Sequence, residues 1–489
     1  MTQDIDPCVR PNPPSPPFDK GGLGGFVCQR GARGDFEGRA SRVNSIGLGR
    51  IGVPALLCGA VGLAYLAAFR GVFQFDDYQV IVLNPAVHSW SGWRDSMPGI
   101  RPLPKLSYLL NWVSGLGIFG FHAVNLLCHA ASALCVWALC RQRGDALGLD
   151  PAQAPAVAVT TTLLFALHPA QTEAVTYISG RSVSLMSLCY LGACLAYQHP
   201  AVGWRRLLSS LLFAAALFTK ETAWTLPFAI LLMEAPSCRA SWRDRLWGLR
   251  LHWAVLILAA GAMLAMQGYR RLLLGSLAIR DLGTNLLTQV EGQFYLLTQP
   301  LLLLRVNIDP DLTVFTTITP GVAFKAAALL LLVLTGILQL RRRPWLGAGI
   351  LWTFLHLLPT NSLLPRLDVA NDRQIYVALI GPAFILAVVL WSHLPRRAAA
   401  LTTLVLALAL GVFTAERNLD YRTEVSLWQA TVRESPNKAR VWNNLGYAYQ
   451  LAGDIPAARQ AYQRALALDP SHVKARINLD TLSQTGEPK

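Results

Sequence analysis

Long apolar segments separated by short polar ones run along the chain from residue 51 to residue 415. About eleven of them approach or reach the ~17–25 residues that an α-helix needs to cross a bilayer. They lie near 51–69, 121–140, 154–168, 183–198, 206–219, 222–235, 251–268, 321–340, 346–359, 375–392 and 398–415. The pattern predicts an all-α, polytopic helical membrane protein with about eleven transmembrane helices.

Two further apolar segments fit a membrane crossing less well. The segment Leu103–Gly117 opens with two prolines and a lysine, which favours a helix lying along the outer membrane surface. The segment Gln289–Leu304 is short and is interrupted by Glu291, Gln293 and Gln299, so the pattern leaves its placement open.

The first 50 residues have a different composition from the apolar region. Prolines and glycines are frequent from Pro11 to Gly25, and no apolar period is present. This stretch also lacks the apolar core of a signal peptide. Several arginines, the last of them Arg50, precede the first apolar segment and favour a cytoplasmic location for this end. We expect residues 1–50 to form a disordered cytoplasmic tail.

The composition changes again after Ala415, where apolar spans give way to an amphipathic pattern. Eight positions match the markers of the tetratricopeptide repeat, a helical hairpin of about 34 residues: Trp442, Leu445, Gly446, Tyr449, Ala458, Tyr462, Ala465 and Pro470. Shifting by one period places a half-repeat on either side of this complete repeat. The pattern predicts a transmembrane domain at 51–416 and an extracytoplasmic repeat domain at 417–489. An ordinary amphipathic helical hairpin is the alternative.

The overall composition agrees with a membrane protein. Hydrophobic residues make up 53% of the chain and charged residues only 15%, whereas soluble globular proteins carry roughly 25% charged residues. The net charge of +15 raises the question of nucleic-acid binding. However, the arginines occur in short clusters between apolar spans, as membrane topology produces. We therefore exclude nucleic acid as a partner.

These basic clusters allow the topology to be checked. With the N-terminus in the cytoplasm, every dense cluster returns to the cytoplasmic side, as the positive-inside rule requires. The clusters are Arg141/Arg143, Arg205/Arg206, Arg239/Arg243/Arg245/Arg250, Arg341–Arg343 and Arg396/Arg397. An odd number of spans then places the repeats outside. We expect a multi-pass protein of the bacterial inner membrane with periplasmic repeats.

The loops on the opposite side contain a different set of ionisable residues. Such residues at the ends of spans are costly unless they are paired or functional, and their gathering on one face suits a single active site. The candidates are Asp76, Asp77, His168, Glu173, Arg181, Lys220, Glu221, Arg366, Asp372, Arg373 and Tyr376.

The order of the short motifs resembles a known family. The motifs are Phe75-Asp76-Asp77-Tyr78, Arg101-Pro102-Leu103, Phe121-His122-Ala123-Val124-Asn125, the segment 168–175, Gly180-Arg181, Lys220-Glu221-Thr222 and Asp372-Arg373-Gln374-Ile375-Tyr376. Together with the repeats they resemble the GT-C superfamily of membrane glycosyltransferases, and most closely the transmembrane and tetratricopeptide-repeat-containing O-mannosyltransferases. The chain departs from the family pattern at Gln171, Tyr78 and Asp372, where other residues are usual.

The resemblance implies an inverting transfer of a sugar such as mannose from a polyprenyl-phosphate donor to a hydroxyl acceptor, such as a protein serine or threonine. The hydroxyl must lose its proton as it attacks, which calls for a carboxylate base. Asp76 or Asp77 would be that base, and the sequence leaves the choice open. Glu173 would orient the acceptor or hold a cation.

The leaving phosphate calls for cations, of which Arg373 is the first candidate, with Lys220, Arg366 and His168 as helpers. Structural interpretations compete with these roles. His168 can cap its span, Arg366 can anchor to headgroups and Arg181 can snorkel towards them. Lys220 with Glu221, and Asp372 with Arg373, can form local ion pairs.

The sequence leaves alternatives open both for the cofactor and for the function. Paired aspartates suit a divalent cation such as Mg²⁺ or Mn²⁺, yet a monophosphate donor does not need one, so no cofactor is certain. The acceptor can instead be a glycolipid or a cell-surface polymer. A non-enzymatic membrane scaffold would account for a protein partner bound at residues 420–485, but it leaves the one-sided ionisable loops unexplained. A lipid transporter would place its charges at the midplane instead.

Overall fold

The computed structural model describes residues 52–97, 99–197, 203–236, 241–299 and 306–485. The tail at 1–50, for which we predicted disorder, lies outside these residues. Within the described ranges the regular secondary structure is entirely helical and no strand occurs. The all-α fold class is therefore confirmed.

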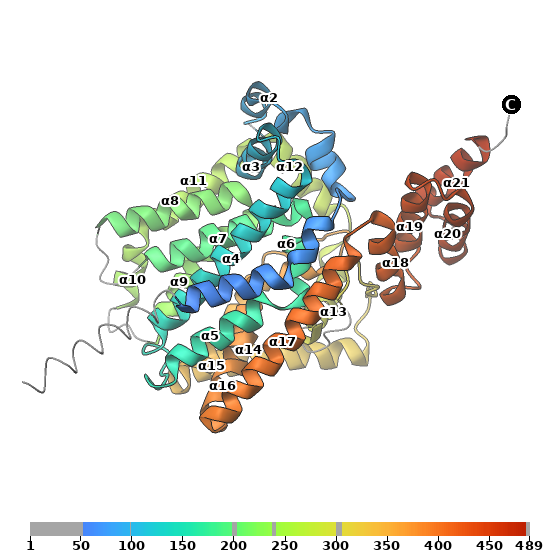
Figure 1. Cartoon of the computed structure of the whole chain (residues 1–489). Coiled ribbons are helices and arrows are strands. Elements are labelled where there is room, and N and C mark those ends of the chain that lie inside the picture. Colours follow the sequence, from blue (N-terminus) through green and yellow to red (C-terminus); the bar gives the residue numbers. More distant parts are fainter. Residues whose placement is uncertain (1–51, 98, 198–202, 237–240, 300–305, 486–489) are drawn as a thin grey trace, which may run out of the picture. The chain divides into compact units, whose positions relative to one another are not determined.

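Each predicted span contains a helix (Figure 1). The helices are Gly52–Ala64, α4 (Gly117–Arg143), α5 (Ala154–Ala166), α7 (Arg181–Ala196), α8 (Gly203–Thr219), α9 (Leu226–Glu234), α11 (Arg250–Ala265), α14 (Pro320–Arg342), α15 (Pro344–Leu357), α16 (Ile380–His393) and α17 (Arg396–Asp420).

Not all of these helices are long enough to cross a bilayer alone. Among the described residues four segments are long and apolar enough: α4, Ile178–Ala196, α14 and α17. The pair of α10 (Trp242–Gly248) and α11, bent by 60°, adds a fifth if it counts as one span. Helix α9 has 9 residues and measures only about 14 Å at the α-helical rise, because its predicted span begins with a 3₁₀ turn, η6 (Glu221–Thr225). The membrane-spanning character is confirmed, but the number eleven stays a prediction.

The helices pack around one large apolar core. Helix α7 packs against both α4 and α8, α5 packs against α16, and α14 forms a hairpin with α15. Aromatic side chains such as Tyr65, Phe165 and Phe213 are fully buried there. By contrast, α14 exposes apolar side chains that include Phe324 and Leu331. Exposed apolar surface on this scale suits contact with lipid rather than water.

Shorter helices connect the long ones. The segment in which we predicted a surface helix forms α3 (Pro102–Val113), which follows the short α2 (Trp90–Asp95), and its location at the membrane surface stays a prediction. Helices α12 (Gln267–Leu277) and α13 (Leu282–Thr298) come later, and α13 contains part of the ambiguous segment. Short turns near the site are η1 (Leu66–Arg70), η2 (Tyr78–Val82), η3 (Pro85–Val87), η4 (Pro169–Gln171), α6 (Thr172–Val175), η5 (Ile178–Gly180) and η8 (Asp372–Ile375).

The C-terminal helices have the predicted repeat arrangement. One complete repeat, α19 (Ala439–Leu451) with α20 (Ile455–Leu468), is flanked by α18 (Glu424–Glu434) and α21 (Val473–Thr485). A Cβ atom on Gly446 would lie 2.7 Å from the ring of Tyr462, so glycine allows these two helices to approach closely. Helix α17 continues unbroken past residue 416, the predicted domain boundary, to Asp420.

Candidate active site

The adjacent aspartates lie in a turn between η1 and η2 and have different environments. Asp77 is fully buried, and its two carboxylate oxygens accept hydrogen bonds from the backbone N–H groups of Gln74 (3.0 Å) and Ser179 (2.7 Å). Burial raises the pKa of Asp77 to about 7. One oxygen thus closes the turn on itself and the other joins the turn to η5, so Asp77 acts as a structural clamp.

Asp76 is partly exposed and faces a cavity. Its backbone N–H donates to the hydroxyl of Tyr177 at 2.9 Å, which fixes the main chain and leaves the carboxylate towards the cavity. Burial raises the pKa of Asp76, while the nearby Arg373 and a hydrogen bond from Tyr177 lower it in part. A carboxylate in this position can accept a proton.

The cavity next to Asp76 has a volume of about 230 Å³. We call it the reaction cavity. Its lining comes from segments that are far apart in the chain: Phe75, Asp76, Glu173, Tyr177, Ile308, Asp309, Leu367, Asp368, Arg373, Tyr421, Leu427, Trp428, Arg440 and Asn444. A single cavity therefore joins the candidate base Asp76 to the candidate phosphate ligand Arg373.

Glu173 holds Arg373 at the cavity wall. The Glu173 Oε1 atom lies 3.3 Å from Arg373 Nε, and Oε2 accepts from the Arg373 backbone N–H at 2.9 Å. The structural alternative, a local pair of Asp372 with Arg373, is not what the structure shows: Arg373 pairs with an acid 200 residues away in the chain. Since Glu173 is 3% exposed, its charge is neutralised by this arginine, and its role is to orient the guanidinium.

Arg373 also lines a second, smaller cavity of about 30 Å³, which includes Lys220, Gln374 and Tyr376. The guanidinium thus stands at the junction of two cavities. One holds the carboxylate of Asp76 and the other the ammonium group of Lys220.

Four basic side chains are close enough to influence one another's charge and form a four-cation cluster: Arg101, Lys220, Arg366 and Arg373. Burial lowers the pKa of Lys220 well below its usual value, and the charges of Arg101, Arg373 and Arg366 lower it further. Burial followed by Arg373 likewise lowers the pKa of Arg366. These mutual repulsions would be relieved by a bound anion.

The local ion-pair interpretation supposed a pair of Lys220 with Glu221. The structure does not show this pair. Glu221 pairs instead with Arg101, whose Nη2 lies 2.7 Å from Oε2 and whose Nε donates at 3.0 Å to Oε1. Among the described residues Lys220 forms no ion pair. Arg101 belongs to a recognised motif, but we did not select it as a site residue, because only the folded chain brings it to Glu221.

Four more of the predicted site residues belong neither to the candidate base nor to the four-cation cluster. Arg181 is fully buried, donates to Asn125 Oδ1 (2.6 Å) and Phe121 O (2.9 Å), and therefore neither binds in the cavity nor snorkels to headgroups. His168 Nδ1 accepts from the Ala170 N–H and caps η4, in agreement with the capping alternative.

The other two are Asp372 and Tyr376. Asp372 is fully buried and accepts from Gln299, away from its neighbour Arg373. The Tyr376 hydroxyl is 2.7 Å from Nδ1 of His129, so this ring reaches the smaller cavity but its polar end is turned into the helical core. Ionisable residues near helix ends can find hydrogen-bond partners inside the protein, and the spacing of residues in the sequence does not reveal which of them do.

A divalent cation at the twin aspartates, which the sequence left open, stays a prediction. Each oxygen of Asp77 accepts one backbone hydrogen bond and keeps a further lone pair, while Asp76 faces the reaction cavity. In the described part of the chain no group of three or more His, Cys, Asp or Glu side chains is arranged to hold a metal ion.

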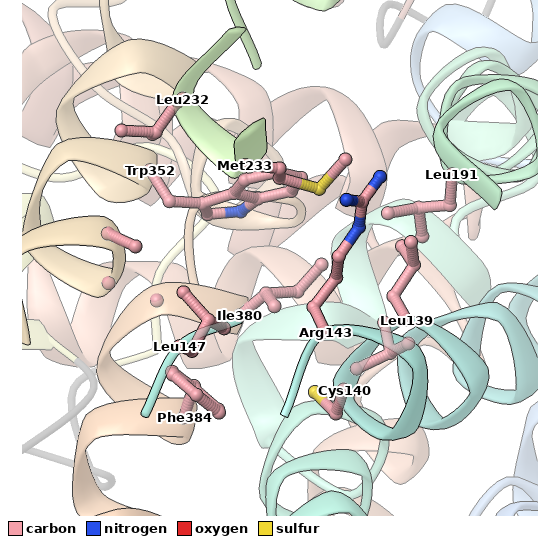
Figure 2. Close-up of a pocket in the computed structure, with 14 residues that line it drawn as sticks. Leu139, Cys140, Arg143, Leu147, Leu191, Leu232, Met233, Trp352, Ile380 and Phe384 are labelled. Atoms are coloured by element: carbon pink, nitrogen blue, oxygen red, sulfur yellow. The ribbon is translucent and has the colours of Figure 1, made fainter. Parts of the chain in front are cut away.

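Two apolar cavities lie elsewhere in the helical body. The first, of about 80 Å³, lies among α4, α7, α9, α15 and α16, and Figure 2 shows Leu139, Leu191, Ile380 and Phe384 around it with Arg143 as the charged group. None of the predicted site residues is in its lining.

The second apolar cavity has about 370 Å³ and runs along α8 and α11. Three methionines and Tyr269 are in its lining. The Tyr269 hydroxyl lies 3.4 Å from the backbone nitrogen of Arg101, so this groove adjoins the four-cation cluster.

Comparisons with known proteins agree with the fold and the motifs. A tetratricopeptide repeat model matches residues 439–472. The chain is 35% identical to the protein O-mannosyl-transferase TMTC1 of Mus musculus over a match that covers 41% of this chain and 24% of that protein. It is 27% identical to the protein O-mannosyl-transferase Tmtc3 of Drosophila melanogaster, with 78% of this chain and 49% of the relative covered.

A third relative is the protein O-mannosyl-transferase F38B6.6 of Caenorhabditis elegans, at 24% identity over 84% of this chain and 62% of that protein. The matches thus span between 24% and 62% of these relatives' own lengths. No solved structure matches the chain. The resemblance inferred from the motifs is confirmed: the chain is a relative of the transmembrane, tetratricopeptide-repeat protein O-mannosyl-transferases.

Proposed function

We propose that this protein is a membrane glycosyltransferase that moves a sugar from a polyprenyl-phosphate donor to a protein hydroxyl on the non-cytoplasmic side. The observation that supports it most is the reaction cavity shared by Asp76 and Arg373. A base for the acceptor and a cation for the leaving phosphate are the two groups such a transfer needs, and they lie on one cavity.

The donor phosphate would bind at the four-cation cluster. Arg373 is oriented by Glu173 and offers a planar guanidinium. Lys220 and Arg366 form no ion pair in the described chain, and a bound phosphate would favour the charged form of both. The apolar groove along α8 and α11 supports a lipid-linked donor, since it adjoins this cluster and suits a prenyl chain.

Asp76 would act as the general base. The acceptor O–H proton passes to the Asp76 carboxylate as the acceptor oxygen forms a bond to the anomeric carbon. The bond from that carbon to the phosphate oxygen breaks, and its electron pair stays on the phosphate beside Arg373. Attack from the face opposite the leaving group inverts the anomeric centre.

The names of the relatives support mannose as the sugar and a protein as the acceptor. A glycolipid acceptor is the second candidate, and a scaffold without activity is the third. Both are separated from the first by the experiment below.

The test compares wild type with Asp76→Asn and Asp77→Asn in proteoliposomes that contain a labelled polyprenyl-phosphate mannose and a serine/threonine peptide. Asp76→Asn should lower kcat by about 10²–10⁴-fold with donor binding and thermal stability retained, because only the proton acceptor is lost. Asp77→Asn should lower the melting temperature, because an amide replaces an oxygen that accepts the Gln74 or Ser179 N–H.

Equal activity of wild type and Asp76→Asn would refute the base assignment. A folded wild type that binds the donor but labels added lipid rather than peptide would favour the glycolipid candidate. A folded wild type that neither binds nor consumes the donor would favour the third candidate, a scaffold without activity.

A further inference from the structure

The reaction cavity is not built by the helical body alone. Four of its lining residues belong to the repeat helices: Leu427 and Trp428 on α18, and Arg440 and Asn444 on α19. They share the cavity with Asp76 and Arg373. The first hairpin of the repeat domain is therefore part of the wall around the candidate chemistry.

The turn that presents Asp76 is tied to this hairpin. The Phe75 N–H donates to Glu424 Oε1 at 2.9 Å, and the Gln74 side chain donates to the carbonyl of Tyr421. The Phe75 ring meets the Trp428 ring edge-on, with centroids 5.5 Å apart. Phe75 has a φ of 45°, in the left-handed region that a bulky residue adopts only when its surroundings hold it there.

A second tie involves two loops that reach the cavity. Arg440 donates through Nε to Asp309 Oδ2 at 2.8 Å and lies 2.6 Å from Asp368 Oδ1, and Lys438 Nζ lies 2.6 Å from Asp309 Oδ1. The side chain of Asp309 is 5% exposed, so losing these partners would leave a buried charge. The loop that holds Asp368 also holds Arg366 and Arg373.

We propose that the α18–α19 hairpin is a fixed wall of the reaction cavity and that Trp428 and Asn444 contact the acceptor, which is an extended polypeptide. The inference rests on the proposed function. A serine or threonine hydroxyl is only two bonds from Cα, so an acceptor whose hydroxyl reaches Asp76 must bring its backbone into the cavity. The wall facing Asp76 then meets backbone amides as well as the hydroxyl.

The two side chains suit that contact. The Asn444 Oδ1 atom accepts from Asn443 Nδ2 at 3.2 Å, while its own Nδ2 has no partner in the described part of the chain and is available to a peptide carbonyl. Trp428 is 4% exposed and borders the cavity, where Ile308, Leu367 and Leu427 add further apolar groups. An amide donor beside apolar groups suits a peptide, whose backbone carbonyl accepts a hydrogen bond and whose side chains pack against the apolar lining.

The test measures transfer by the full-length protein to synthetic serine/threonine peptides of graded length, with donor KM and acceptor KM determined separately. Asn444→Ala should raise the acceptor KM by about five- to tenfold, the loss of one hydrogen bond, with kcat and donor KM unchanged. Trp428→Phe should raise the acceptor KM as well. Gln463→Ala, at an exposed position on α20, is the control and should behave as wild type.

The effect should persist in the shortest peptide, because the contact lies within the cavity. An Asn444→Ala effect seen only with long acceptors would overturn the inference in favour of a remote docking surface, and unchanged acceptor KM in both variants would overturn it outright. If wild type transfers no sugar to any peptide, the proposed function has failed, which is a different result from these.

Discussion

Residues 76 and 77 carry the same side chain but differ in what surrounds each carboxylate. Each Asp77 oxygen accepts a backbone N–H, whereas Asp76 faces the reaction cavity and Arg373. Tyr177 contributes to the difference, since its hydroxyl accepts from the Asp76 N–H and stabilises the Asp76 carboxylate. The sequence offered both aspartates as bases and could not choose, because adjacent residues on a turn have no periodicity that reveals which is buried.

Tyr177→Phe should change the pH dependence of transfer. The base works ionised, so activity falls as the pH drops through the pKa of Asp76, which burial holds above the usual carboxyl value. Removing the Tyr177 hydroxyl withdraws a hydrogen bond that lowers this pKa. The acidic limb of kcat/KM should therefore move to higher pH, with the plateau at high pH kept. Tyr462→Phe serves as control, and a limb that stays in place or moves to lower pH contradicts the assignment.

The short turns between helices, rather than the long helices, position the candidate site. Elements α6, η5 and η8 bring Glu173, Ser179 and Arg373 together within a few residues of helix ends. Gly180 is required by this arrangement, because a Cβ atom there would lie 2.3 Å from the carbonyl oxygen of Glu173. The motif Gly180-Arg181 was recognised from sequence, but its reason is close backbone packing and a buried arginine rather than substrate binding.

Gly180→Ala should destabilise the protein by about 1–3 kcal/mol and reduce transfer, since backbone atoms must shift to admit the methyl group. Gly192→Ala in α7 is the matched control, because its added methyl would meet only a leucine side chain at 3.5 Å. Melting temperature and kcat should both drop in the first variant and stay near wild type in the second. Equal melting temperatures for the two variants would contradict the packing argument.

On the scale of the whole molecule, ion pairs across long sequence separations define the site. Arg101 pairs with Glu221, Glu173 with Arg373, and Arg440 with both Asp309 and Asp368. The same contacts place the repeat hairpin on the reaction cavity. The sidedness that we infer for the site follows from the basic clusters of the sequence and is a prediction of its own.

Labelling of single cysteines, in a background without the native ones, tests that sidedness. Leu367→Cys and Val473→Cys are at exposed positions and should react with a membrane-impermeant reagent in intact spheroplasts. Arg342→Cys, which is also exposed, should react only after permeabilisation. Labelling of Leu367→Cys and Arg342→Cys from the same side would contradict the topology.

The sequence by itself determined the helical segments, the membrane character and the repeat, because apolar period and repeat markers are local properties of the chain. Helix length was harder to predict, since 3₁₀ turns such as η6 shorten the α-helix within an apolar segment without interrupting the hydrophobic pattern. Only the tertiary structure decided which aspartate faces the cavity, which acid orients Arg373, and that α18 and α19 complete the wall. These depend on distances between loops that are far apart in the chain, and such distances are set by how the helices pack.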